Sequence, residues 1–160
     1  MRTLFRISAA LGLLALFAAR AGNAQQVVTR PSLTLEGAKA VAAAAAAEAK
    51  RLNAPGGAIA VVDDGGNIVY VERLEGTFPR GPEISIEKAR TAALFRRPSK
   101  DLENAIVGGR TVLLNVASAP LQGGVPIVSN GVIIGAIGVS GAATAAQDTQ
   151  LAEAGAAAIR

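Results

Sequence analysis

The sequence predicts an α+β domain in which helices cover a roughly five-stranded antiparallel sheet. Alanine-rich segments with helical periodicity lie near both ends of the chain, at about 34–52 and 145–159. Between them, the stretches GGAIAVVDDGGNIVYV and GGVPIVSNGVIIGAIG share one pattern of Gly-Gly, strand, turn and strand. Two hairpins between helices are typical of an α+β sandwich, in which the helices bury the faces of one sheet.

The first predicted helix begins after Thr34 and runs to about Leu52. Thr34 can accept a hydrogen bond at the N-terminus of the helix, and alanine, which dominates the segment, is the strongest helix former. Small side chains recur at helical spacing along one stripe. We therefore expect this helix to lie close against the sheet.

The first predicted hairpin pairs residues 58–62 with residues 68–73 across the turn Asp63-Asp64-Gly65-Gly66-Asn67. The first run is apolar throughout, so we expect both of its faces to be covered. The second run ends in charged residues, which favours a position nearer an edge of the sheet. Asp63 and Asp64 could also hold a metal, but Asp-Gly is a common turn device and the turn is favoured.

A second helix is predicted between Ser85, as its N-cap, and Pro98. Lys88 falls on its polar side. A short helical turn is predicted at 99–101, and the segment 110–118 is predicted as the fifth strand. The expected inner stripe of the second helix consists of four residues: Ile86, Ala89, Ala93 and Leu94.

The second predicted hairpin pairs residues 125–128 with residues 132–139 around Ser129-Asn130-Gly131. Asn-Gly is a strong hairpin signal because both turn positions favour positive φ. The second of these strands carries small apolar residues on both faces, which predicts a central strand with layers on both sides. The last predicted helix follows, from about Ala145 to Ile159.

Composition excludes several classes of site. The chain has no cysteine and no histidine, so disulfides, thiolate metal sites and a Ser-His-Asp triad are impossible. Its net charge of +4 falls to about +1 without the three arginines of the first 24 residues, where sixteen basic residues become thirteen against twelve acidic ones. This balance gives no indication of nucleic-acid binding.

Two short motifs suggest catalysis only weakly. Ser85 and Lys88 match S-x-x-K, but the K-T-G partner of that motif is missing, and a capping serine with a surface lysine explains the same letters. Ser140, in GVSGA, has no histidine to activate it, although its hydroxyl could contact a ligand. Gln147 and Asp148, near the start of the last helix, can stabilise the helix dipole, line a pocket, or do both.

The first 24 residues are predicted to be a secretory signal peptide. Arg2 and Arg6 precede an apolar run at 7–19, and small residues lead to a cleavage site after Ala24. The apolar run is shorter than the roughly 20 residues that a membrane-spanning helix needs, so no stable membrane anchor is expected. Residues 25–160 then form a single domain, located in the periplasm or secreted.

A family resemblance rests on four stretches in this order: AIAVVDDGGNIV, SIEKARTAALF, GGVPIVSNGVIIGAIGVSG and QDTQLAEAG. Over roughly Leu33 to the C-terminus, the sequence resembles the GlcG/HbpS-like haem-binding family and is similar to the C-terminal domain of PduO-type proteins. The resemblance implies a helix-covered antiparallel sheet, a homo-oligomer, and haem or a related tetrapyrrole as the ligand of several members. Other members accompany catabolic operons.

The resemblance also implies a set of site residues. Lys88 and Thr91 match the family motif K-A-x-T-A, with Arg90 inside it. Among the usual types of axial haem ligand, the mature chain retains only Tyr70, with a lysine amine as an unusual substitute. The full set of expected ligand-binding residues is Tyr70, Arg73, Lys88, Thr91, Gly123, Gly124, Pro126, Ser140, Gln147 and Asp148.

Three hypotheses about function follow. The first is an exported, oligomeric module that binds a small hydrophobic or tetrapyrrole ligand. The second is an enzyme or accessory protein that acts on a small organic acid in a catabolic pathway, with charge supplied by Lys88, Arg73 and Asp148. The third is an assembly protein without a ligand, which uses its alanine-rich helices as interfaces.

Overall fold

The computed structural model describes residues 28–159. The predicted signal peptide lies outside these residues. Within them, no helix is both long enough and apolar enough to cross a membrane. The elements, in chain order, are α2 (Leu35–Arg51), β1 (Ala58–Asp63), β2 (Ile68–Arg73), α3 (Gly81–Phe95), α4 (Ser99–Val107), the 3₁₀ helix η2 (Thr111–Asn115), β3 (Gly124–Ser129), β4 (Val132–Ser140) and α5 (Ala145–Ala156).

The sheet is antiparallel throughout, with the strand order β2-β1-β4-β3. It has four strands, so the prediction of a fifth strand at 110–118 was wrong. Gly109, at φ 99°, ends α4 by letting the Arg110 N–H bond back to the Ala105 carbonyl at 2.9 Å. The chain then closes into η2, where the Leu113 N–H donates to Arg110, three residues back.

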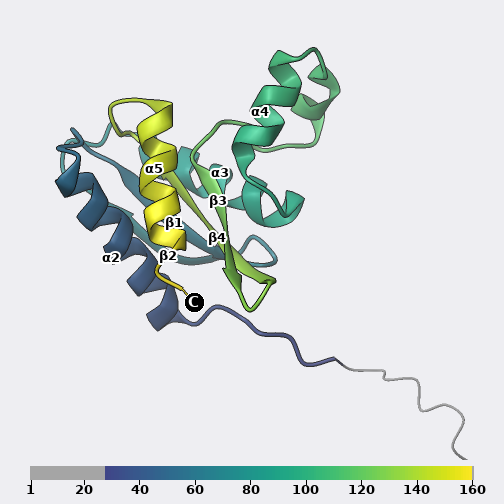
Figure 1. Cartoon of the computed structure of the whole chain (residues 1–160). Helices are drawn as coiled ribbons and strands as arrows, with labels where there is room; N and C mark the ends of the chain where they lie inside the picture. Colours follow the sequence, from purple (N-terminus) through teal and green to yellow (C-terminus); the bar gives the residue numbers. More distant parts are fainter. Residues whose placement is uncertain (1–27, 160) are drawn as a thin grey trace, which may run out of the picture. The chain divides into compact units, whose positions relative to one another are not determined.

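The helices form two layers around the sheet (Figure 1). Ile59 and Val61 of β1 belong to the core beneath α2 and α5, whereas Ala60 and Val62 belong to the core beneath α3. β1 is therefore covered on both faces and β2 lies at an edge, as predicted. Thr34 caps α2 by accepting the Gly37 N–H at 3.1 Å, which also confirms the prediction for the first helix.

β4 lies at the centre of the sheet, as predicted from its small side chains. A Cβ atom on Gly138 would overlap the carbonyl oxygen of Ser85 and lie 2.5 Å from the backbone nitrogen of Ala89. The backbone of α3 therefore lies almost directly on β4. The hairpin turn before β4 also has the predicted geometry, with φ of 49° at Asn130 and 77° at Gly131.

The start and the inner face of α3 differ from the prediction. The helix begins at Gly81, with Pro82 in its first turn, because proline fits there without the N–H that it lacks. Ser85 is thus fully buried inside the helix, where its hydroxyl donates to the Pro82 carbonyl at 2.7 Å. Leu94 is 57% exposed instead of buried, whereas Lys88, expected on the polar side, is only 3% exposed.

Asp63 organises the turn between β1 and β2, which confirms the favoured interpretation of this motif. Its Oδ1 accepts the backbone N–H of Gly65 at 2.9 Å and that of Asn67 at 2.8 Å. Burial raises the pKa of this carboxyl, but hydrogen bonds from the Asn67 side chain and from the turn N–H groups outweigh it and hold the pKa below its ordinary value. The turn is thus most stable when Asp63 is ionised.

We expect the variant Asp63→Ala to lower the free energy of unfolding at pH 7 by about 1 kcal/mol, the usual contribution of such hydrogen bonds. Because the folded-state pKa is depressed, this contribution is fully present above the ordinary aspartate pKa and is lost as the pH falls through the folded value. Urea unfolding at pH 7 and pH 3 measures the difference, with Asp64→Ala as the control. An equal loss at both pH values would contradict this assignment.

Candidate functional site

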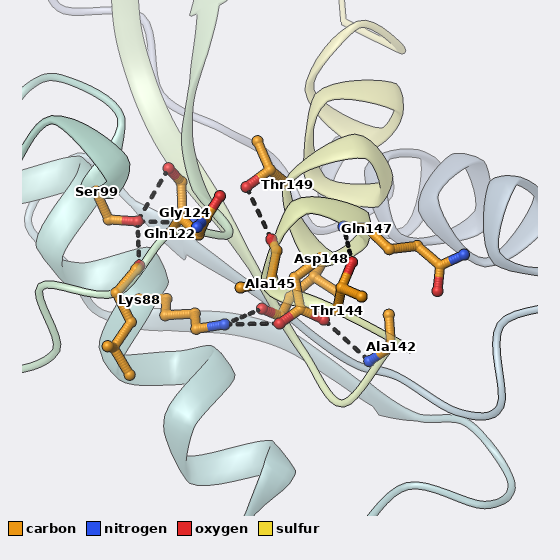
Figure 2. A network of polar contacts seen from close by, with 12 residues as sticks. Lys88, Ser99, Gln122, Gly124, Ala142, Thr144, Ala145, Gln147, Asp148 and Thr149 are labelled. Carbon is orange, nitrogen blue, oxygen red and sulfur yellow. Dashed lines mark hydrogen bonds and ion pairs between the residues drawn. The ribbon is translucent and has the colours of Figure 1, made fainter. Parts of the chain in front are cut away.

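The most buried charges in the described residues form one ion pair. The Nζ of Lys88, on α3, lies 2.8 Å from Oδ2 of Asp148 in the first turn of α5. The two side chains are only 4% and 8% exposed. Figure 2 shows Lys88 and Asp148 pointing toward each other. Lys88 Nζ also donates to the Val139 carbonyl of β4 at 2.9 Å. Both charges are therefore compensated in an environment where an unpaired charge would be very unfavourable.

The second oxygen of Asp148 holds the chain between β4 and α5. Its Oδ1 accepts the Ala142 N–H at 2.9 Å, within the loop that leads into the helix. Thr144 caps α5 by accepting the Gln147 N–H at 3.1 Å, and Oε1 of Gln147 accepts the Ala143 N–H at 2.8 Å. These carboxylate and amide groups accept the backbone N–H groups that precede the helix, and Asp148 also lies in the first turn, where the predicted interaction with the helix dipole is favourable.

Gly123 and Gly124 bring β3 against the ion pair. Gly123 has φ 113°, and a Cβ atom there would lie 3.0 Å from the Nζ of Lys88. A Cβ atom on Gly124 would overlap the carbonyl oxygen of Lys88. The Gly123 carbonyl accepts the Val139 N–H at 2.9 Å. The two glycines are therefore required by close approach of the backbone to α3 and β4.

Ser99 is a site residue that the sequence analysis missed. Its hydroxyl donates to the Leu121 carbonyl at 2.6 Å and accepts the Gly124 N–H at 2.9 Å, and its side chain is fully buried (Figure 2). Thr91 acts similarly, because its Oγ1 accepts the Ala119 N–H at 3.3 Å. A serine after Pro98 indicates only a helix start, and nothing local shows that its partners lie more than twenty residues further along the chain.

The structure brings together four of the predicted site residues, namely Lys88, Gly123, Gly124 and Asp148. Thr91 binds the backbone of Ala119, in the segment that leads to Gly123 and Gly124. Tyr70 lies elsewhere: it pairs with Val61, so its side chain belongs to the α2 and α5 face of the edge strand β2, and its hydroxyl lies 3.5 Å from Glu72 Oε2. Tyr70 and the ion pair therefore do not form one site.

The remaining predicted residues have separate surroundings. Arg73, at the end of β2, donates to the Thr77 carbonyl at 2.7 Å and lines a hollow of about 180 Å³ with Leu74, Glu75 and Gly76. Pro126 lies on the edge strand β3, opposite Ala136. Ser140 is buried at the end of β4, opposite Ala58.

Catalytic chemistry has little support in this geometry. The Ser85 hydroxyl bonds to Pro82 and the Lys88 amine bonds to Asp148, so S-x-x-K does not form a nucleophile and base pair. Among the described residues, no group of three or more acidic side chains is placed to hold a metal ion. The ion pair and its glycines instead act as a joint between α3, α5, β3 and β4.

A sheet covered by α2 and α5 on one face and by α3 on the other, joined by a buried lysine–aspartate pair, defines a small α+β sandwich domain. The chain belongs to the HbpS-like family: the model of the family described as "Haem degrading protein HbpS-like" matches residues 33–157. The chain is 45% identical to protein GlcG of Escherichia coli K12 over 113 residues, which cover 70% of this chain and 84% of GlcG.

Two solved structures have the same fold. A double mutant of HbpS from Streptomyces reticuli gives a TM-score of 0.78 at 31% identity, covering 88% of this chain and 95% of HbpS. A crystal structure of a PduOC:haem complex gives a TM-score of 0.71 at 24% identity, covering 81% of this chain and 96% of that chain. Because the identity is only 24%, the similarity to the PduOC:haem structure shows a shared fold and no more.

We expect Asp148→Asn to lower the free energy of unfolding by about 3 kcal/mol or more, because it leaves Lys88 buried without a counter-charge. The double variant Lys88→Met, Asp148→Leu removes both charges and should recover part of this loss. It still leaves Val139 and Ala142 each without one hydrogen bond, at about 1 kcal/mol apiece. Denaturant unfolding at pH 7 measures the free energy of unfolding of the wild-type chain, of Asp148→Asn and of the double variant.

The control for this experiment is the exposed pair of Lys39 and Glu36, whose side chains are 49% and 80% exposed. The variant Glu36→Gln should cost no more than about 0.5 kcal/mol, as expected of a pair within one helix at the surface. If Asp148→Asn proves as mild as Glu36→Gln, the joint does not stabilise the fold in the way described.

Proposed function

We propose that this chain is an exported protein that binds a haem-type tetrapyrrole as a homo-oligomer. The observation that carries the proposal is membership of the HbpS-like family over residues 33–157, which is nearly all of the described chain. The fold of the PduOC:haem complex supports it, because the same layers of helices and sheet occur in a protein crystallised with haem.

The donor chemistry of the chain restricts how haem would be held. With no histidine or cysteine and with methionine only at position 1, the chain has one phenol, Tyr70, as its strong candidate ligand. Tyr70 is half-buried on the outer strand β2, with the Glu72 carboxylate beside its hydroxyl. Lys88 does not fit an axial role, because its amine is held by Asp148 and Val139.

If haem binds, Tyr70 would hold the iron through its phenol oxygen, and the neighbouring Glu72 carboxylate would take up the phenol proton. Haem, when bound, supplies a redox-active iron and a strong absorption band. The hollow beside Arg73, about 180 Å³, is smaller than the roughly 300 Å³ at which small-molecule pockets begin. That hollow would therefore not enclose a macrocycle, and Tyr70 and Glu72 would hold haem from the edge strand β2.

Binding of haem is expected to be saturable, with a shifted Soret band when haemin is added to the purified chain. Tyr70→Phe removes only the phenol oxygen, so it should shift the band maximum and weaken binding at least tenfold. Glu72→Gln is the matched control, since it keeps the shape of the edge strand but loses the proton acceptor. It should weaken haem binding less than Tyr70→Phe does.

Absence of a saturable Soret shift in the wild-type chain would contradict the haem proposal. A shift that Tyr70→Phe leaves unchanged would contradict the role of Tyr70 alone. If haemin fails and a small carboxylate stabilises the protein through Arg73, the second hypothesis, an enzyme or accessory protein for a small organic acid, takes its place. The size of the hollow suits such an acid.

Export is the other part of the proposal. The charged start, the apolar run at 7–19 and the small residues before Gln25 support cleavage after Ala24. We expect the protein recovered from the periplasm or the medium to begin at Gln25 when its N-terminus is sequenced. Arg20 precedes the cleavage site, so it should be absent from the recovered protein. Full-length chain in the cell interior would contradict export.

A further inference from the structure

The tip of the β3–β4 hairpin carries a chemically reactive pair of residues. Asn130 is followed by Gly131, and no other asparagine of the sequence precedes a glycine. The pairing of the two strands ends at Ser129 opposite Val132, so Asn130 and Gly131 are the two residues of the turn. Both are exposed, and a Cβ atom added to Gly131 would have nothing within 4 Å beyond its own chain neighbours. The backbone nitrogen of Gly131 is therefore not crowded by side chains.

We propose that Asn130 is a site of spontaneous modification, at which the side-chain amide becomes a carboxylate through a cyclic imide. The backbone nitrogen of Gly131 loses its proton and attacks Cγ of Asn130. An N–Cγ bond forms, the Cγ–Nδ2 bond breaks and ammonia leaves. Water then opens the ring at one of its two carbonyls. Attack at Cγ gives aspartate, whereas attack at the main-chain carbonyl gives isoaspartate, in which the chain runs through the side chain.

Other asparagines in turns lack the features that favour this reaction at Asn130. Asn53 has nearly the same backbone angle, with φ 50° against 49°, but the nitrogen that would attack it, that of Ala54, donates to a carbonyl of α2 at 2.9 Å. The Asn67 amide donates to both carboxylate oxygens of Asp63, at 3.2 and 3.0 Å. The residue after each of them also has a Cβ atom, which hinders approach to the nitrogen.

Opening of the turn limits the rate of the reaction. Asn130 and Gly131 have φ of 49° and 77°, the left-handed region that a two-residue hairpin turn requires. Ring closure requires rotation about the Cα–C bond of Asn130, so the turn must first leave this conformation. The flanking side chains of Val128 and Val132 are 45% and 41% exposed, and a tip with so little buried apolar area opens at low cost. We therefore expect a slower reaction than in an unfolded peptide.

The two products differ in their effect on the hairpin. Aspartate has nearly the shape of asparagine and tolerates the left-handed conformation as well. Isoaspartate adds one carbon to the main chain between Ser129 and Val132, where the length of the turn sets the register of the strands. Both products add one negative charge. The isoaspartate form is therefore expected to be the less stable of the two.

Mass spectrometry with peptide mapping tests the modification in the full purified chain, incubated at 37 °C and pH 8. A synthetic peptide of residues 127–133 sets the time scale. We expect at least half of Asn130 to be converted within ten half-times of the peptide, with both products present. Isoaspartate identifies the cyclic imide, because direct hydrolysis of the amide gives aspartate alone. Asn53 and Asn67 should remain amides in the same sample.

Gly131→Ala is the matched control, because its methyl group hinders attack while the open space around the turn accommodates it. It should slow the conversion of Asn130 at least tenfold. Because alanine is strained at positive φ, a circular dichroism melt must show that the variant folds. The variant Asn130→Asp, measured when freshly prepared, should melt like the wild-type chain, whereas the separated isoaspartate form should melt at a lower temperature.

Three results would overturn this inference. Asn130 could remain an amide beyond ten half-times of the peptide, aspartate could form without isoaspartate, or Gly131→Ala could convert as fast as the wild-type chain. The modification does not involve Tyr70 or Arg73, so the haemin titration stands apart from each of these results.

Discussion

The ion pair between Lys88 and Asp148 connects α3 on one face of the sheet with α5 on the other. It lies where β4 ends and the chain turns into α5, so it fixes both the end of the central strand and the start of the last helix. A buried pair of this kind contributes little net stability, but loss of either partner is strongly destabilising. Its structural role is therefore to require one arrangement of these elements and to penalise others.

Small residues make this arrangement possible. The backbone of α3 contacts β4 at Gly138, and Gly124 brings β3 under the carbonyl of Lys88. On the opposite face, Ala38, Ala42 and Ala45 of α2 are fully buried. Each close approach excludes a larger side chain, so the alanine and glycine content of the chain reflects the distances between layers rather than local propensity alone.

The small apolar side chains that fill the core also limit the chemistry that the interior can perform. The core is filled with alanine and β-branched residues, and the buried polar groups in the described residues are all satisfied within the protein. The proposed haem site therefore lies at the surface, at the β2 edge with Tyr70.

Much of the fold was predictable because its signals are local. Periodicity and capping gave α2, the Asn130-Gly131 turn gave the second hairpin, and apolar runs marked β1 and β4 as interior strands. The segment 110–118 was wrongly predicted as a strand because its residues have high strand propensity. The observed 3₁₀ helix η2 depends instead on how Gly109 ends α4. Propensity is a weak guide when the neighbouring glycine decides the direction of the chain.

The candidate site was predicted in part. The resemblance singled out Lys88, Gly123, Gly124 and Asp148, which the structure does bring together. Tyr70, expected as the one remaining axial ligand of a usual type, lies apart from them, because strand register places its side chain on the opposite face from α3. Ser99 was missed because its partners are distant in sequence.

The sequence by itself determined the class of fold, the family and the absence of histidine and cysteine chemistry, since these depend on composition and on local patterns. Only the tertiary structure decided that Lys88 is buried and paired. A lysine in a helix is usually solvated, and its burial depends on a carboxylate sixty residues away. Folding alone brings such a partner within 2.8 Å, where Coulomb attraction and hydrogen bonding can offset the loss of water.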